Sequence, residues 1–418
     1  MPEAQLYRTR VDCRACGSPH LSKFIDLGST PLADKFSEKS DTPEDKFPLR
    51  VFFCHDCGLV QMLDVVNDDV LFGNDYAFVT HASPSAIEHF KEYAKDVSIR
   101  LNKSHSPFNP NAGLIVDIAS NDGVLLQAFK DCYFNNVLGI EPVTYIADEA
   151  TKNGIETWPK FFNKQVAEEI VAAKGKAVLV TANNVVAHVD HLIDFMEGIR
   201  SLLTADGMAV LEMQYLPNLL FKNEFDNIYH EHRSFFSLTP LVTLLKKVGL
   251  EIFDVEEVDS QGGSIRVFVG CSGVITRQES VDKMLATEKE LGLLDFETYK
   301  GFQARVNQIK VTLNETLSKL KAKGKHIAGY GACAKSCTLL NYCDVAKYLD
   351  YIEDKTDYKI GKFAPGSRLP VIKKNDRTPP DYYLLLIWNY LEGVLKREAE
   401  YLAKGGHFVI PIPNPTIV

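Results

Sequence analysis

The sequence lacks any long run of apolar residues. No stretch approaches the roughly 20 apolar residues that a bilayer-spanning helix needs. The first residues, MPEAQLYRTRVDC, contain no apolar core of the signal-peptide kind, and internal repeats and low-complexity tails are also missing. We therefore expect a cytoplasmic protein that makes no use of a membrane.

An excess of basic residues is missing as well. The 418 residues carry a formal net charge of −9, with 46 Lys and Arg against 55 Asp and Glu. Because phosphate backbones attract basic surfaces, this balance argues against a nucleic-acid partner. It leaves open a nucleotide-sized ligand, which needs only a local cationic or amide-lined site.

The length and the pattern of the chain predict three domains. A chain of this length is too long for one typical domain, and its 45% of hydrophobic residues supplies several cores. Residues 1–75 are rich in Cys, Gly, Pro and turn residues, whereas residues 76–273 alternate between strand and helix patterns. Residues 274–418 begin with long polar helices and continue as a second alternating unit. Nothing in the sequence fixes the oligomeric state, and a monomer is compatible with it.

The middle region predicts an α/β fold. Candidate strands lie at 114–119, 137–141, 177–182 and 208–213, with helical stretches between them. Such alternation is typical of a parallel sheet with helices on both faces. The region ends with LEIFDVEEV, a Gly-rich turn and SIRVFVG, which predict an antiparallel hairpin that closes the sheet.

Four of the nine cysteines have the spacing of metal ligands. Cys13 and Cys16 form one CxxC pair, and Cys54 and Cys57 form a second. Zinc prefers four thiolates in a tetrahedron, and each CxxC turn presents two sulfurs to one side of the ion. We therefore predict a structural Zn²⁺ site with no open position for substrate. The alternative is that these are redox pairs or free thiols.

A candidate cofactor loop follows the strand LIVDIA. The turn runs from Ser120 to Gly123, Asp117 lies near the strand end, and Glu141 ends the next strand about 20 residues after the loop. That offset suits a carboxylate that binds ribose hydroxyls. Glycines are sparse, since Ala119 and Asn121 stand where GxG would place them. This favours S-adenosylmethionine over a dinucleotide, although a dehydrogenase or a plain structural turn remain alternatives.

A reactive segment follows the strand MAVLEM. It includes Tyr229, His230, Glu231 and His232, and it comes after the carboxyl end of a strand, where open α/β sheets bind ligands. Histidine is the side chain best suited to proton transfer near neutral pH, and a neighbouring carboxylate can orient it. The alternatives are a second metal site or satisfied polar groups in a turn.

A second Gly-rich turn follows the predicted strand at 326–328. Gly329, Gly331 and Ala332 form the turn, and Lys335 comes early in the following helix. A helix N-terminus with a lysine suits a phosphate group. Two such units facing each other would hold two ligands across one cleft.

Several segments together resemble the three-domain nucleotide-sugar C-methyltransferases, which act on dTDP-linked 4-keto sugars. The segments are the two CxxC pairs, DLGSTPLADKF (26–36), SNDG (120–123), GIEP (139–142), ANNVVAHV (182–189), IYHEH (228–232), QGGSIRVF (261–268), GYGACAKSCTLLNY (329–342), WNY (388–390) and GGHFVIPIP (405–413). The resemblance covers nearly the whole chain. It implies a zinc-binding N-terminal domain, a Rossmann-like middle domain that binds S-adenosylmethionine, and a second Rossmann-like C-terminal domain that helps to hold the nucleotide sugar.

The resemblance also implies roles for individual residues. It implies His232 as general base, with Tyr229, Glu231, Tyr76 and His188 lining the same site. The implied cofactor-binding residues are Asp117, Ala119, Ser120, Asn121, Gly123, Glu141, Phe161 and Asn183, and the implied substrate-binding residues are Gly329, Tyr330, Gly331, Ala332, Lys335 and Asn341. Two departures from the family pattern are Ser336–Cys337, where small residues are expected, and Gln214, where a proline is expected.

The expected reaction is methylation of a carbon next to the keto group of a 4-keto-deoxysugar, with C3 favoured over C5. Two other classes compete with it. A zinc-containing RNA methyltransferase is disfavoured by the acidic charge, and an NAD-dependent oxidoreductase is disfavoured because the GYGA turn lacks a following GxxG pattern.

Overall fold

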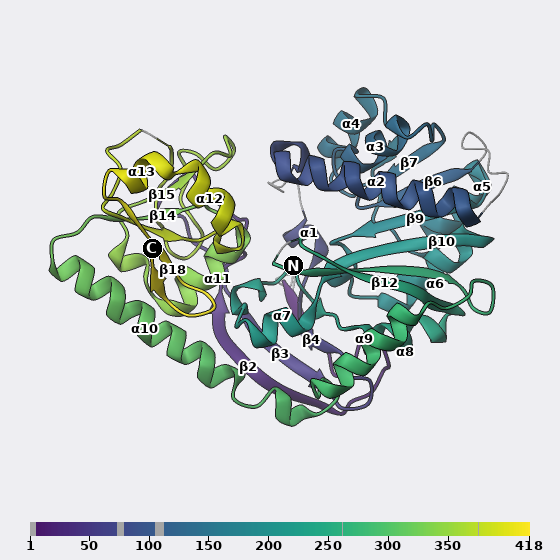
Figure 1. Cartoon of the computed structure of the whole chain (residues 1–418), viewed down its shortest axis with the longest axis horizontal. Coiled ribbons are helices and arrows are strands. Elements are labelled where there is room, and N and C mark those ends of the chain that lie inside the picture. The colour runs from purple at the N-terminus through teal and green to yellow at the C-terminus, as the bar shows by residue number, and fades with distance from the viewer. Residues whose placement is uncertain (1–5, 73–78, 105–112, 261, 375) are drawn as a thin grey trace, which may run out of the picture.

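The computed structural model describes residues 6–72, 79–104, 113–260, 262–374 and 376–418. Figure 1 shows two α/β lobes, with purple N-terminal strands running beneath and between them. Within the described ranges, none of the helices is both long and apolar enough to cross a membrane.

The N-terminal region is built from antiparallel strands. Its elements are β1 (Tyr7–Thr9), β2 (Leu21–Thr30), β3 (Phe47–Cys54), β4 (Val60–Met62), β5 (Asp64–Val66) and α1 (Asp68–Leu71). β1 pairs with β5, and the main sheet has the order β11-β4-β3-β2. β11 (Ser234–Phe235) comes from the middle of the chain, so this sheet joins the N-terminal strands to the segment that follows His232.

The first α/β lobe has a seven-stranded sheet in the order β12-β13-β10-β9-β6-β7-β8. Its strands are β6 (Leu114–Ile118), β7 (Val137–Ile140), β8 (Thr157–Trp158), β9 (Ala177–Asn183), β10 (Leu203–Gln214), β12 (Leu250–Val258) and β13 (Ser264–Cys271). β13 is antiparallel to β10 and β12, which confirms the predicted closing hairpin. The strand order reverses between β6 and β9, and ligands bind outside such a reversal in open α/β sheets.

Helices cover both faces of this sheet. They are α2 (Pro84–Ser104), α3 (Val124–Asp131), α4 (Thr144–Lys152), α5 (Lys164–Lys174), α6 (Leu192–Leu202), α8 (Leu238–Lys247) and α9 (Glu279–Glu290), and the same part of the chain has 3₁₀ turns η1 (Thr80–Ala82) and η2 (Val186–His188). In contrast, α7 (Leu216–Phe221) and η3 (Phe225–Asn227) pack in the core shared by the N-terminal strands and the second lobe. β6 is buried along its whole length, as a central parallel strand must be. The apolar side chains of α9 join the same core, so α9 packs with this lobe.

The second lobe repeats the architecture on a smaller scale. Its sheet has the order β16-β15-β14-β17-β18-β19, with only β19 antiparallel. Its elements are η4 (Phe296–Thr298), α10 (Phe302–Ala322), β14 (Ile327–Tyr330), α11 (Ala334–Cys343), η5 (Ala346–Tyr348), β15 (Ile352–Asp354), β16 (Val371–Lys373), β17 (Tyr382–Leu385), η6 (Trp388–Tyr390), α12 (Leu391–Arg397), α13 (Ala399–Ala403), β18 (His407–Ile410) and β19 (Thr416–Ile417). The order reverses again, between β14 and β17. Two Rossmann-like units therefore stand on one N-terminal base, with α10 running beside β2 (Figure 1).

Candidate active site

The four predicted zinc ligands converge in the N-terminal region. The Sγ atoms of Cys13 and Cys57 lie 3.6 Å apart, those of Cys16 and Cys54 lie 3.5 Å apart, and all four lie within 4.8 Å of one another. A tetrahedral zinc ion with bonds of about 2.3 Å separates its sulfur ligands by about 3.8 Å. The sulfur geometry therefore fits one zinc ion with four protein ligands and no open position.

Both order reversals open into one cleft of roughly 1520 Å³. The first lobe lines it with the loop after β6 and with Asn183 at the end of β9, and the second lobe lines it with Cys333 after β14 and Ile387 after β17. Ligand pockets for one small molecule commonly hold about 300–1,000 Å³. A cleft of this size, with a reversal point at each side, suits two ligands at once.

The predicted cofactor loop forms the wall of the cleft on the first lobe. The lining residues include seven of the eight predicted there: Asp117, Ala119, Ser120, Asn121, Glu141, Phe161 and Asn183. Gly123 is the exception, because it begins helix α3 with its Cα facing Ile155. Ala119 and Asn121 have φ of 57° and 50°, so they take the left-handed conformation that glycines take in a GxG loop. Such strained backbone gathers at functional sites.

Carboxylates give this wall its chemistry. Glu141 accepts hydrogen bonds from the backbone N–H of Asn121 at 3.0 Å and of Val143 at 2.9 Å, which ties the loop to the end of β7. Asp117 is bonded to the Thr181 hydroxyl, and burial raises its pKa to about 7. Acceptors of this kind suit S-adenosylmethionine, which carries ribose hydroxyls, an ammonium group and a sulfonium.

His232 lines the cleft, and both of its ring nitrogens have hydrogen-bond partners. Nδ1 is 2.7 Å from the carbonyl oxygen of Asn227, and Nε2 is 2.7 Å from the hydroxyl of Tyr229. A carbonyl only accepts, so Nδ1 carries the proton and Nε2 accepts from the Tyr229 O–H. Burial lowers the pKa of His232 to about 4, so the ring is neutral at pH 7 with Nε2 as a base.

Asn227, which sets the tautomer of His232, is itself held on two sides. Its side chain accepts from the Gln214 amide at 3.0 Å and donates to Glu224 at 3.0 Å. Gln214, which stands where a proline was expected, therefore helps to hold the residue that orients the base. The prediction that a neighbouring carboxylate orients His232 is wrong, because the Asn227 carbonyl does so.

The remaining predicted catalytic residues, and His230 of the same segment, lie in three different places. His188 lines the cleft with its ring 5.3 Å from that of His232, and burial followed by the charge of His232 lowers its pKa well below the usual value. Glu231 also lines the cleft, and burial raises its pKa well above the usual value. His230 points the other way, with Nε2 3.1 Å from the carbonyl of Phe47, so the two histidines do not share a face. Tyr76 lies outside the described residues.

In the second lobe, the residues that line the cleft come a few positions after the predicted glycine turn in the sequence. Cys333, Ala334 and Lys335 line it. Gly329, Gly331 and Ala332 lie beneath it and do not, since a Cβ on Gly331 would meet Ile387 at 2.6 Å. The two remaining predictions are corrected, because the Tyr330 hydroxyl donates to Glu398 and the Asn341 amide to the carbonyls of Cys337 and Pro365, away from the cleft.

Lys335 is buried between the lobes. Its ammonium lies 5.3 Å from the centre of the Trp388 ring, and it faces Asp226 and Glu224 of the catalytic segment, which is the stretch from Glu224 to His232. Burial, opposed by the charge of Lys335, raises the pKa of Asp226 to about 6 and that of Glu224 to about 7. The lysine therefore lies at the edge of the cleft beside the His232 segment.

Sequence reasoning missed an acid in the second lobe. Asp354 ends β15, accepts from the backbone N–H of Ala332 at 2.7 Å and of Thr356 at 2.8 Å, and lines the cleft. Glu141 makes the same pair of contacts in the first lobe, one to its loop and one to the residue two positions on. The rule that selected Glu141, an acid at the end of the second strand of the unit, would have found Asp354.

Comparisons with known proteins agree with this arrangement. Family models match three segments, described as a putative zinc binding domain (13–72), a methyltransferase domain (88–255) and a C-methyltransferase C-terminal domain (259–413). The chain is 35% identical to the C-methyltransferase NovU of Streptomyces niveus over 413 residues, which covers 97% of this chain and 96% of that protein.

Solved structures of methyltransferases cover part of this chain. An S-adenosylmethionine-dependent methyltransferase of Clostridium acetobutylicum is 14% identical, with 45% of this chain and 92% of that chain covered and a TM-score of 0.35. Magnesium protoporphyrin IX methyltransferase of Synechocystis is 13% identical, with 45% and 81% covered and a TM-score of 0.33. From the full-length match and the three family models, the chain belongs to the S-adenosylmethionine-dependent C-methyltransferases that carry an N-terminal zinc-binding domain.

Proposed function

We propose that this C-methyltransferase methylates the carbon next to the keto group of a nucleotide-linked 4-keto-deoxysugar, at C3 of a dTDP-sugar. The observation that carries the proposal is the shared cleft. The loop of one Rossmann-like unit, the turn of a second and the neutral His232 ring all line it. A methyl donor on the first lobe and a nucleotide on the second would bring the sugar between them, beside His232.

The chemistry needs a base, because a carbon is a poor nucleophile until a proton leaves it. A keto group acidifies the adjacent C–H bond, since the electron pair left on carbon spreads onto oxygen as an enolate. Nε2 of His232 takes the proton, either directly or through Tyr229, whose oxygen accepts it while its own proton passes to Nε2. The Asn227 carbonyl then stabilises the Nδ1–H of the imidazolium.

The other residues of the cleft stabilise the negative charge that develops on the enolate oxygen. Bound S-adenosylmethionine supplies an electrophilic methyl group. An N–H or O–H donor beside the enolate oxygen contributes roughly 3–4 kcal/mol when it is preorganised. His188, whose ring centre lies 5.3 Å from that of His232, is the candidate for this donor.

The second lobe is suited to the nucleotide end. Asp354 has the contacts that Glu141 has in the cofactor loop, and Lys359 lies beside it with its ammonium 2.8 Å from the carbonyl of Ala332. A carboxylate for a ribose hydroxyl and lysines for the diphosphate are the groups that a nucleotide diphosphate needs.

Methyl transfer to a panel of nucleotide-linked 4-keto sugars tests the proposal. With dTDP-4-keto-deoxysugars we expect a product about 14 mass units heavier, the mass of one CH₂, and NMR should place the new methyl group on C3. The reaction should be at least about 10⁶-fold faster than without enzyme, as is typical of enzymes. Methylation at C5, on oxygen or of none of the sugars would contradict it.

Glu141→Ala is expected to weaken adenosylhomocysteine binding by roughly 10- to 100-fold, because hydrogen bonds to a charged group contribute about 1.5–3 kcal/mol. Calorimetry measures the dissociation constant. Asp354→Ala is the matched control from the equivalent position of the second lobe, and it should weaken nucleotide-sugar binding instead. Equal losses for both ligands in both variants would contradict the division of the cleft.

Lys335→Ala is expected to raise the KM for the nucleotide sugar by about tenfold or more, and to change the KM for S-adenosylmethionine less, because it removes a cation from the phosphate side of the cleft. Steady-state kinetics with each substrate varied in turn measures this. Lys321→Ala is the control, since Lys321 pairs with Asp350 on the same lobe away from the cleft. An unchanged KM for the sugar would move the phosphate site elsewhere.

A further inference from the structure

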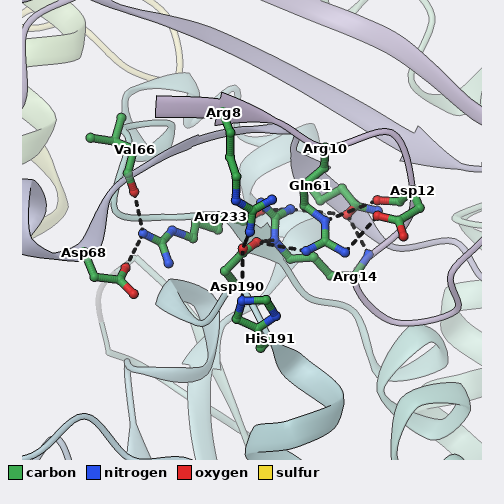
Figure 2. Close-up of polar contacts among 10 residues, drawn as sticks. All are labelled: Arg8, Arg10, Asp12, Arg14, Gln61, Val66, Asp68, Asp190, His191 and Arg233. Atoms are coloured by element: carbon green, nitrogen blue, oxygen red, sulfur yellow. Dashed lines mark hydrogen bonds and ion pairs between the residues drawn. The ribbon is translucent and has the colours of Figure 1, made fainter. Parts of the chain in front are cut away.

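Arg14 connects the zinc-binding residues to the methyltransferase lobe. It lies between the ligands Cys13 and Cys16, and its side chain is fully buried. Its Nε donates to Asp190 at 2.9 Å, and its Nη1 donates to the carbonyl of Arg233 at 3.1 Å (Figure 2). One guanidinium in the first zinc turn therefore contacts two segments that are more than 40 residues apart in the sequence.

Both contacts lie next to a histidine of the cleft. Asp190 follows His188 by two residues, and Arg233 follows His232 directly. The Arg233 carbonyl also accepts from the backbone N–H of Met62 at 2.9 Å, where β11 pairs with β4 of the zinc-binding sheet. The backbone on the C-terminal side of each histidine is thus fixed to the N-terminal region.

Arg14 is itself held in a fixed position. Its backbone N–H and its Nη1 both donate to the side-chain oxygen of Gln61, at 3.0 and 3.2 Å. Gln61 lies on β4 and is completely buried. The path from the zinc turn to the two histidine segments therefore consists of fully buried side chains with few alternative conformations.

The arginine side chains around Asp190 fix the positions of the segments that they join more than they stabilise the fold. Arg8 and Arg10 also pair with this carboxylate, so three guanidinium groups surround one buried acid, with Arg233 nearby (Figure 2). Removing several charges from water is costly, and buried ion pairs add little net stability compared with apolar packing. Their directional contacts do specify one arrangement of the segments that they join.

We propose that Arg14 and Asp190 are positioning residues, through which the zinc-binding turn fixes His188 and His232 relative to each other. The catalytic role of the two histidines depends on the proposed function, whereas their placement by Arg14 and Asp190 depends only on the contacts described above. Neither residue needs to touch the reacting atoms. A shift of about 1 Å at a catalytic group is enough to cost roughly 100-fold in rate.

Arg14→Lys tests the proposal, because lysine keeps the charge but cannot contact Asp190, Gln61 and the Arg233 carbonyl together. Arg50→Lys is the matched control: the Arg50 guanidinium also donates to a buried aspartate of the same region, Asp64, at 2.7 and 2.8 Å, and Arg50 does not line the cleft. We expect kcat to fall roughly 10- to 100-fold in Arg14→Lys and less than twofold in Arg50→Lys. Zinc content and the dissociation constant for adenosylhomocysteine should match the wild type in both variants.

Hydrogen–deuterium exchange supplies a readout that does not depend on turnover. Arg14→Lys should lose protection at 186–191 and 228–234 and keep it in β3, even if no tested sugar is a substrate. Failure of the proposed function is thus separate from failure of this inference. If Arg14→Lys fails to fold, Arg8→Gln removes one exposed guanidinium from Asp190 and should show the same pattern more weakly. Unchanged exchange in both segments, or loss of zinc from Arg14→Lys, would overturn the inference.

Discussion

His232→Asn is expected to lower kcat by about 10²–10⁴, the range that a general base contributes. Asparagine keeps much of the shape of the ring and can still donate toward the Asn227 carbonyl, but it cannot accept a proton from carbon. The side chain lines the cleft, and its two ring nitrogens contact Asn227 and Tyr229 rather than the cofactor loop. Adenosylhomocysteine and the nucleotide sugar should therefore bind with nearly unchanged dissociation constants.

Solvent exchange isolates the proton-transfer step. With adenosylhomocysteine in place of the methyl donor, the wild type should exchange the proton next to the ketone for deuterium, and His232→Asn should not. Tyr229→Phe removes the hydroxyl that donates to Nε2, so a loss as large as that of His232→Asn would identify Tyr229 as a proton relay. His230→Asn is the control, since His230 faces Phe47 and not the cleft. Near-normal turnover in His232→Asn would exclude it as the base.

The pH profile provides a second check on the same residue. Burial lowers the pKa of His232 to about 4, and a base works only while it is unprotonated. Activity therefore survives as the pH falls below 6.5, where an ordinary histidine gains its proton, and is lost only as the pH falls toward the lowered value. We therefore expect no loss of activity near pH 6.5 that can be assigned to protonation of His232, while Asp117 and Glu224, whose pKa values burial raises to about 7, titrate in the same range in both the wild type and His232→Asn. A limb near pH 6.5 that His232→Asn removes would show that the bound state restores an ordinary pKa.

The cofactor loop could be predicted from the sequence because its signal is local. A strand, a small-residue turn, a helix start and an acid at the next strand end all lie within about 30 residues. Even the missing glycines were informative, because Ala119 and Asn121 adopt the left-handed backbone that glycine would supply. The zinc ligands could be predicted equally well, because each CxxC turn is itself a local pattern and only one contact between the two turns is needed to complete the site.

The directions in which side chains point were harder to predict from the sequence. The pattern IYHEH does not show that His230 and His232 face opposite ways, because that depends on the turn that places the Asn227 carbonyl at Nδ1 of His232. The glycines of the second turn are likewise not among the residues that line the cleft, and a Cβ on Gly329 or Gly331 would meet Leu386 or Ile387.

Pairings between distant segments were not visible at all. β11 joins the zinc-binding sheet across more than 170 residues of sequence, and Arg14 reaches Asp190 across 176. Neither strand length nor spacing signals such a contact, since β11 spans two residues. The interdependence of the zinc-binding region and the catalytic segment is therefore a property that only the structure shows.

Cys54→Ser is expected to release the zinc ion and to unfold the N-terminal region. Structural zinc sites of this kind bind with about 10–16 kcal/mol of free energy that is also folding free energy, so losing one thiolate costs a large part of it. The β2–β3–β4 sheet has Cys54 at the end of β3 and Cys57 in the turn that leads to β4, and it holds β11. Loss of zinc should therefore also disorder the backbone after His232.

Metal analysis, thermal unfolding and limited proteolysis measure the effect of Cys54→Ser. Cys132→Ser is the matched control, because Cys132 ends helix α3 in the first lobe and is not among the converging thiols. We expect one zinc per chain in the wild type and in the control, and none in Cys54→Ser, with a cut within residues 6–66. The first lobe should still bind adenosylhomocysteine, because its loop is held by Glu141 and its own strands. If instead zinc is absent from wild-type protein purified without chelator, or Cys54→Ser unfolds at the wild-type temperature, then the sulfurs converge for packing alone and the N-terminal region draws its stability from the sheet.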